Sequence, residues 1–301
     1  MLWVAAIVGG YLGLILPNGR LSVTPVSLIL PDSIANDEFV GNLVRPRFAQ
    51  VQNFLGFPVA RPSALFGFTN EWGGNVGLLT PFFVAATLFS DNPQRRRWGV
   101  IGLLAALPPM MLSVNRGLWL SAAAIMALVA LRSFLLGRPG PLKFFGAAVV
   151  VIVALLALTP IGGLVSGRLS ESDTGAREGI YREAWAGALE SPIFGWGGPR
   201  PSANPFSPPV GTHGHLWFAM FAHGFVGLGL YLAWMGWAML RSRVHRDPVS
   251  VMLAAVVFVG FVQMFFYKML PVSLPIISLR LESSPGVSDS DAAPMSAPGR
   301  Q

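Results

Sequence analysis

Apolar runs separated by short polar loops make up most of the chain. One run begins at residue 1, and further runs occupy residues 74–90, 98–114, 117–136, 143–161, 215–240 and 250–268. A helix needs about 20 apolar residues to cross the hydrocarbon core, where every backbone group must be bonded within its own segment. The pattern therefore predicts an all-α protein, a polytopic membrane bundle of about seven spans. The run 266–279, which two prolines interrupt, fits either a re-entrant segment or a distorted last helix.

Basic residues predict the orientation of this bundle. Three basic clusters lie between paired spans: Arg95–Arg97, then Arg132, Arg138 and Lys143, then Arg241, Arg243 and Arg246. Lys and Arg concentrate in the cytoplasmic loops of membrane proteins, so we assign these clusters to the cytoplasmic side. Residues 17–73, 113–117 and 162–214 then lie on the outer face of the cytoplasmic membrane.

The same alternation divides the chain into five segments. They are a first short span with an outer-face segment (1–73), a block of four spans (74–161), a long outer-face loop (162–214), the C-terminal spans (215–281) and a tail (282–301). The first run lacks a basic leader and a cleavage site, which indicates a short span and not a cleaved signal. The tail is rich in Ser, Ala and Pro, and it is too poor in apolar residues to fold.

Composition excludes a single soluble domain. Hydrophobic residues make up 53% of the chain and charged residues 12%, whereas soluble proteins carry about 25% charged residues. The net charge of +7 flanks the apolar runs, so the topology rule accounts for it and we expect no nucleic-acid partner. The absence of cysteine excludes disulfides and thiolate metal sites.

The long outer-face loop contains a predicted helix. It begins near Asp173 or Thr174, which are favourable N-cap residues, and it ends before Pro192. Apolar residues recur at helical spacing, which predicts an interfacial helix along the outer membrane surface. Arg177 and Tyr181 are four residues apart and share one face of this helix.

Polar residues also stand at the outer ends of two spans. Arg116 lies in the short outer turn SVNRG, where the topology rule disfavours arginine. From position alone, an interface residue that reaches a lipid phosphate explains it. His213 and His215 stand at the start of the run 215–240, although a membrane span needs no imidazole and a histidine at a span end is usually a packing or interface residue.

Four stretches of the chain together carry the motifs of a known family. MLSVNRGLWLSAAAIMALV has a Ser-x-x-Arg-Gly span opening, and AREGIYREAWAGALESPIFGWGG has an arginine, an aromatic residue four positions on and a Pro-x-x-Gly-x-Gly close. THGHLWFAMFAHGFVGLGLYL is a span led by histidine, and RPSALFGFTNEWGGNVGLLTPFF (61–83) precedes and enters an earlier span. The pattern resembles the O-antigen ligase and polymerase superfamily of polytopic membrane glycosyltransferases over about residues 60–240.

The resemblance implies that the protein moves a glycan from a polyprenyl diphosphate to an acceptor hydroxyl at the outer face, in the assembly of surface polysaccharide. Arg116 and Arg177 match the two family arginines and would hold the diphosphate, since guanidinium bonds phosphate oxygens in pairs. His213 matches the family histidine and would be the general base. The expected partners are the donor glycan, a glycan or glycolipid acceptor and the lipid bilayer. Supporting positions are Arg182, Tyr181, His215, Arg61 and Asn70.

The chain departs from the family pattern at two points. Family members usually carry more spans before this region, so the chain looks shortened at its N-terminus. The family histidine is commonly followed by Asn, where this chain has Gly214. An inactive shortened paralogue is therefore one alternative. A membrane transporter is another, but coupled transporters commonly place ionisable residues inside spans, and the central stretches here contain no Asp or Glu.

We expect neither a cofactor nor a metal ion. His213 and His215 form a His-x-His pair, but the neighbouring loop offers no third ligand. The outer-face carboxylates are scattered and form no Asp-x-Asp pair. The outer-face arginines supply the positive charge that a divalent cation would bring, so activity should persist in excess EDTA.

Overall fold

The computed structural model describes residues 1–53, 58–135, 174–241 and 247–267, together with a few short stretches between 137 and 154. Most of these residues are helical, as the apolar runs predict. The predicted span 143–161 lies largely outside the described residues, and the run 266–279 and the tail 282–301 lie outside them from residue 268 onward.

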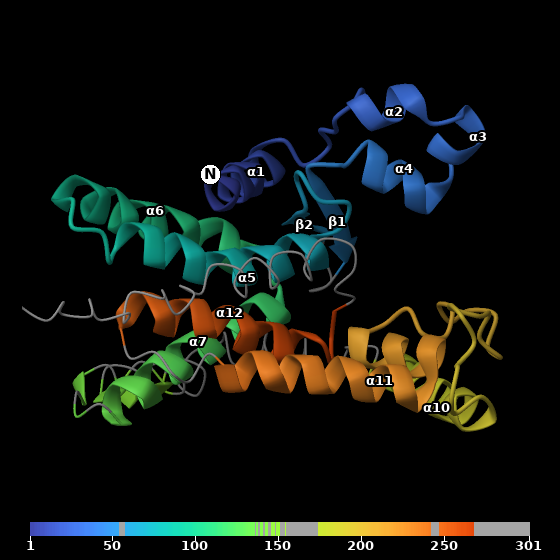
Figure 1. The fold of residues 1–301 in the computed structure, drawn as a ribbon. Helices are drawn as coiled ribbons and strands as arrows, with labels where there is room; N and C mark the ends of the chain where they lie inside the picture. Colours follow the sequence, from blue (N-terminus) through green and yellow to red (C-terminus); the bar gives the residue numbers. More distant parts are fainter. Residues whose placement is uncertain are drawn as a thin grey trace, which may run out of the picture.

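Five long helices run in roughly one direction through the molecule (Figure 1). They are α5 (Thr69–Thr87), α6 (Pro93–Leu112), α7 (Arg116–Leu135), α11 (His215–Arg241) and α12 (Pro248–Gln263). A further helix, α1 (Leu2–Ile15), packs against α5 and α6. The main core lies where α5, α7 and α12 meet, and it includes Trp72, Val76, Leu118 and Val256.

Among the described helices, α7 and α11 are long and apolar enough to cross a membrane, and α1 and α12 are shorter apolar helices. Only 28% of the most apolar window of α7, and the same share for α11, is buried within the protein. The core helix of a soluble protein is apolar because it is buried on all sides. These two helices are apolar and still largely uncovered by the described part of the protein.

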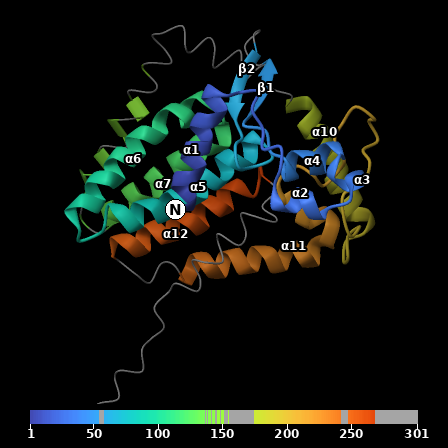
Figure 2. The same ribbon diagram turned by 90° about the horizontal axis from the view of Figure 1, so that it is seen from above.

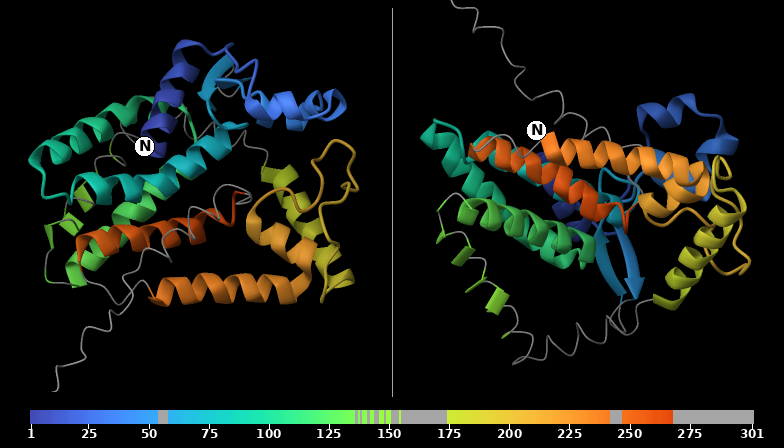
Figure 3. Two further views of the ribbon diagram at one scale, coloured as in Figure 1. Left: turned by 45° about the horizontal axis from the view of Figure 1, so that its top comes forward. Right: turned by 60° about the horizontal axis from the view of Figure 1, so that its bottom comes forward.

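The shorter elements gather at one end of the bundle, which we call the loop end (Figures 1, 2 and 3). They are α2 (Pro25–Ile29), α3 (Asp32–Ala35), α4 (Glu38–Val44), β1 (Ala49–Asn53), β2 (Pro58–Pro62) and α10 (Thr174–Glu190). The described parts of both long segments expected on the outer face therefore share one end. The first turn of α6 and the last turns of α7 and α11, which carry arginines of the basic clusters, lie at the opposite end (Figure 1).

A β-hairpin in the first outer-face segment is a departure from the sequence prediction. β1 and β2 pair antiparallel, from Ala49 opposite Pro62 to Asn53 opposite Pro58. The expectation of an all-α chain is wrong at this hairpin, and it also omitted the short helices α2–α4. Prolines at both ends of β2 argue against a strand in the sequence, but proline is tolerated where a strand begins or forms an edge.

The helix predicted in the long loop is present as α10, which docks on the first half of α11. Ala184 and Ala188 of α10 pack in one cluster with Phe221 of α11. Next to them, Trp185 meets Phe225 of α11 edge-on, at 5.7 Å between ring centroids, and Trp185 and Leu189 are 51% and 58% exposed. The helix thus packs on α11 and still leaves large apolar side chains exposed.

α11 is broken at Gly224, whose φ of 67° and ψ of −173° lie outside the helical range. The loop that follows α10 supplies the missing backbone partners at this break. Its bonds are Trp196 N–H to Phe221 O (3.0 Å), Gly197 N–H to Ala222 O (2.9 Å) and Phe225 N–H to Pro192 O (2.7 Å). The Pro-x-x-Gly-x-Gly sequence therefore completes a kinked helix, a role that its composition did not indicate.

Replacing Gly224 with alanine should destabilise the protein by about 1–3 kcal/mol. Alanine is strained at a φ of 67°, and its Cβ would lie 2.5 Å from the carbonyl oxygen of Ile193. Thermal unfolding of the purified protein in detergent measures the loss. Gly229→Ala is the matched control in the same helix, because no atom lies within 4 Å of the added Cβ. Equal melting of Gly224→Ala and wild type would contradict this account of the kink.

Candidate functional site

Asn115, the residue before α7, is buried at the loop end and joins three helices. Its Nδ2 donates to the carbonyl of Thr69 at 2.9 Å, and its Oδ1 accepts from the N–H of Leu118 at 3.1 Å and from the hydroxyl of Tyr267. These contacts reach the start of α5, the first turn of α7 and the residues after α12. Arg116 is exposed at the next position, so this network fixes the backbone that carries it.

The turn before Asn115 is strained and held in place by Arg61. Val114 has a φ of 48°, a left-handed conformation that is rare for a β-branched residue. The carbonyl of Ser113 accepts from Arg61 Nε at 2.8 Å, and Arg61 is only 7% exposed. Such strain costs about 1–3 kcal/mol and persists only where surrounding contacts impose it, commonly at functional sites. Arg61 is therefore a residue that positions the turn of Arg116.

Tyr267 brings the segments of Arg116 and His213 together. Its hydroxyl donates to Asn115, next to Arg116, and its carbonyl accepts from the backbone N–H of His215 at 2.8 Å. The N-termini of α7 and α11 are thus tied to one residue at the end of α12. Arg116 and His213 were predicted to act at one site from separate motifs, and Tyr267 links the side chain of Asn115, next to Arg116, with the backbone of His215, two residues after His213.

The hydrogen bonds around His213 favour the neutral tautomer with its proton on Nδ1, which leaves Nε2 able to act as a base. His213 is half-buried, and its Nδ1 lies 2.9 Å from the hydroxyl oxygen of Thr212. The Thr212 hydroxyl donates its proton to the carbonyl of Pro209 at 2.6 Å, so toward His213 it can only accept. Nδ1 of His213 therefore carries the proton, and the ring's lone pair is on Nε2.

His215, predicted as a supporting residue, is buried among aromatic side chains. It is 4% exposed at the start of α11. Its ring lies 4.8 Å from that of Tyr231 and 5.7 Å from that of Phe218, measured between centroids. Together with the bond from its N–H to Tyr267, this packing fixes the start of the helix that follows His213.

Tyr181 anchors α10 on the first turn of α11. Its ring stacks on Trp217 at 4.6 Å between centroids with 13° between the planes. Arg177 lies one helical turn before Tyr181 in α10, and its side chain is outside the described part of the structure.

Two predicted supporting residues do not join this group. Arg182 is exposed and pairs with Glu178 of the same helix at 2.6 Å, and Asn70 is exposed in the first turn of α5. An ion pair between exposed residues one turn apart contributes little to stability. Both residues are surface positions in this structure.

The starts of three helices lie together at the loop end. The N-termini of α5, α7 and α11 meet around Asn115 and Tyr267. Helix N-termini carry a partial positive charge, although several of their N–H groups, those of Thr69, Leu118, His215 and Leu216, already donate within the protein. Exposed Arg116 adds a full positive charge at the start of α7, and Glu71 adds a negative one in the first turn of α5.

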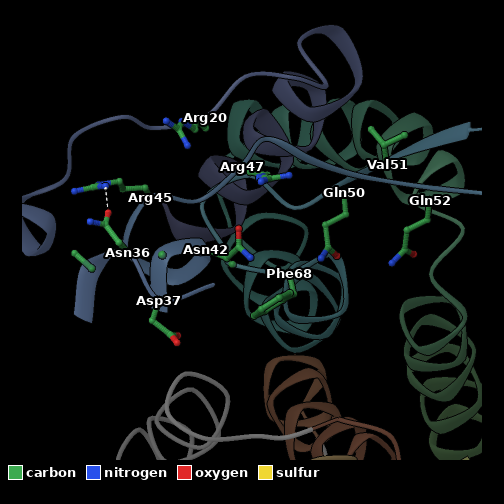
Figure 4. A pocket seen from close by; sticks show the side chains of 13 residues that line it. Arg20, Asn36, Asp37, Asn42, Arg45, Arg47, Gln50, Val51, Gln52 and Phe68 are labelled. Atoms are coloured by element: carbon green, nitrogen blue, oxygen red, sulfur yellow. Dashed lines mark hydrogen bonds between the residues drawn. The ribbon is translucent and has the colours of Figure 1, made fainter. Parts of the chain in front are cut away.

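A cavity of about 460 Å³ opens at the loop end, and sequence reasoning missed it (Figure 4). Residues from α3, α4, β1 and the adjoining loops form it. Its polar lining comprises Arg20, Asn36, Asp37, Asn42, Arg45, Arg47, Gln50 and Gln52. A signal was available, because the three arginines fall in a segment predicted to lie on the outer face, where the topology rule gives no reason for them.

Comparison with known proteins adds no assignment. The sequence matches no protein-family model, and neither the curated proteins nor the solved structures contain a match. Within the described ranges, no three His, Asp or Glu side chains lie together in a way that could hold a metal ion. The function proposed below therefore rests on the positions and hydrogen bonds of these residues.

Gly117→Ala should destabilise the protein by about 1–3 kcal/mol, because the added methyl group has no space. Its Cβ would overlap the hydroxyl and ring of Tyr267, which would separate the starts of α7 and α11. Tyr267→Phe removes only the hydroxyl and should cost about 1 kcal/mol. Thermal unfolding in detergent compares both variants with Gly236→Ala, whose Cβ meets no atom within 4 Å. A Gly117→Ala protein as stable as this control would refute the packing described here.

Proposed function

We propose that the protein is a multi-pass glycosyltransferase of the cytoplasmic membrane, with its active site on the outer face. It transfers a glycan from a polyprenyl diphosphate to a hydroxyl of a glycan or glycolipid acceptor. The observation that carries this proposal is the link through Tyr267 between the segments of Arg116 and His213. An anion-binding cation and a base at adjacent helix starts are the two groups that this transfer requires.

Exposed apolar side chains support the membrane location. Large apolar residues are exposed on three long helices: Trp98, Leu104 and Met111 on α6, Leu120, Met126 and Leu131 on α7, and Leu230, Trp237 and Leu240 on α11. Soluble monomers rarely expose contiguous apolar patches larger than a few hundred Å². Lipid around the bundle would cover these residues, and about seven spans follow if the remaining apolar runs also cross.

The proposed reaction uses three side chains in two roles. Nε2 of His213 takes the proton of the acceptor hydroxyl while the hydroxyl oxygen attacks the anomeric carbon of the donor. The bond from that carbon to the diphosphate oxygen breaks, and the electron pair leaves with the diphosphate. Arg116 and Arg177 stabilise the departing charge, assisted by the neighbouring helix N-termini. The diphosphate leaves as a stable anion, so no acid is needed to protonate it.

Single cysteines should report opposite sides of the membrane. Ala203→Cys, in the loop between α10 and α11, should react with an impermeant maleimide in intact cells. Gln94→Cys, at the start of α6, should react only after permeabilisation. Both positions are exposed, and the native chain contains no cysteine that would add background. The reverse labelling pattern would invert the topology and remove the proposed site from the outer face.

Loss of Arg116 or His213 should nearly abolish transfer. Arg116→Ala should lower the rate about 100-fold or more, and Arg116→Lys should recover little because its ammonium lacks the paired donors of guanidinium. His213→Gln should also lower the rate about 100-fold or more, since a general base contributes at least that much. The assay combines purified protein, a polyprenyl-diphosphate glycan and an acceptor glycolipid.

Matched controls for this assay are Arg96→Gln and His223→Gln. Arg96 is exposed at the basic end of α6, and His223 is exposed within α11, ten positions beyond His213. Both variants should transfer at the wild-type rate. Full activity of Arg116→Ala would end the assignment of the diphosphate site.

A further inference from the structure

The cavity at the loop end concentrates positive charge without matching negative charge. Arg20, Arg45 and Arg47 line it, and Asp37 is its single lining carboxylate. The lining therefore carries a formal charge of +2, from three arginines and one aspartate. Within the described ranges none of the three arginines forms an ion pair, in contrast to Arg182 at the surface.

The backbone forces two of these arginines to be neighbours. Arg20 and Arg47 are directly opposite each other in an isolated antiparallel bridge. Like charges in directly opposed positions destabilise a strand pair. The bridge is secured by bonds from Phe48 N–H to Gly19 O at 2.8 Å and from Leu21 N–H to Pro46 O at 3.1 Å. An anion bound between the two side chains would remove the repulsion.

Arg45 has donor capacity that the protein does not use. Its Nη1 donates to Asn36 at 3.3 Å (Figure 4). Its Nε is buried and has no hydrogen-bond partner among the described residues. A guanidinium has five N–H donors, so the outer nitrogens of Arg45 have capacity for a ligand beyond the bond to Asn36.

Amide side chains complete the cavity and connect it to the proposed transfer site. The amide oxygen of Gln50 accepts from the N–H of Thr69 at 2.9 Å, and that of Gln52 accepts from Arg61 Nη1 at 2.9 Å. With their oxygens engaged, both residues have NH₂ donors to offer a ligand. Thr69 and Arg61 in turn contact the turn that carries Arg116.

Size and chemistry indicate the class of ligand. A cavity of about 460 Å³ falls within the range of about 300–1,000 Å³ typical of small-molecule sites. Arginines suit a carboxylate or phosphate, the amides suit hydroxyl groups, and Phe68 offers an apolar surface for a sugar ring. We propose that this cavity binds an acidic saccharide unit, bearing a carboxylate or a phosphate, of a glycan that the enzyme uses. The proposal rests on the proposed function for the origin of the saccharide.

Binding can be measured without catalysis. The full-length protein in detergent is titrated with glucuronate, glucose 6-phosphate and glucose, and binding is followed by saturation-transfer NMR. Glucuronate or glucose 6-phosphate should bind at least tenfold more tightly than glucose. Arg20→Gln and Arg47→Gln, which alter exposed side chains, should weaken binding of the acidic sugar at least tenfold, whereas Arg96→Gln should leave it unchanged.

Several outcomes would overturn the proposal. Equal binding of glucose and the acidic sugars would remove the role of charge, and undiminished binding by Arg20→Gln and Arg47→Gln would place the sugar elsewhere. Displacement of the sugar by phosphatidylglycerol vesicles, but not by vesicles of neutral lipid, would assign the cavity to a lipid headgroup. Arg116→Ala, which lies outside the cavity lining, should bind the acidic sugar normally. Normal binding with no transferase activity in the wild type would sink the proposed function and leave this site standing.

Discussion

The hydrogen bond between Tyr267 and Asn115 is the contact on which the rest of the loop end depends. Asn115 is 1% exposed, and a buried amide is tolerated only when its donors and acceptors have partners. Its partners come from α5, from α7 and from the end of α12. Because the amide cannot be satisfied by any one helix, the starts of α5 and α7 have a fixed relation to the end of α12.

In the proposed membrane location, hydrogen bonds between helices take on added weight. Apolar contact alone does not drive helices together in a bilayer, so close packing of small residues and interhelical hydrogen bonds take on that role. Both are present between the central helices: Gln263 donates to Ser121 at 2.8 Å and to the carbonyl of Gly74 at 3.0 Å. Glycine at position 117 leaves the space that the Tyr267 ring fills. The polar contacts therefore fix how α5, α7 and α12 are aligned along their lengths. This alignment in turn positions the residues around Asn115 at the loop end.

Sequence alone predicts the helices well and the contacts between them poorly. The apolar runs predicted the helix that starts at Arg116 and the one that starts at His215, because a long apolar run with few charged residues favours one continuous helix. The same rule makes no prediction for residues 17–73. The hairpin and the cavity in this segment are formed by prolines, amides and arginines that follow no periodic pattern. The kink at Gly224 was also missed, since its partners come from a loop 25 to 33 residues earlier in the chain. The tautomer of His213 depends on Pro209 through Thr212, which no spacing reveals.

Arg61 forms hydrogen bonds both to the turn before Arg116 and to the wall of the cavity, and its sequence motif did not predict this link. Nε of its guanidinium holds Ser113, beside the strained Val114, and Nη1 holds Gln52 in the wall of the cavity. The guanidinium is planar and rigid, so the two bonds cannot adjust independently. A lysine has one donor group and could make only one of the contacts well. The rigid fork therefore ties the cavity wall to the Arg116 turn. Under the function proposed above, such a link would hold a donor and an acceptor in a fixed relation for transfer.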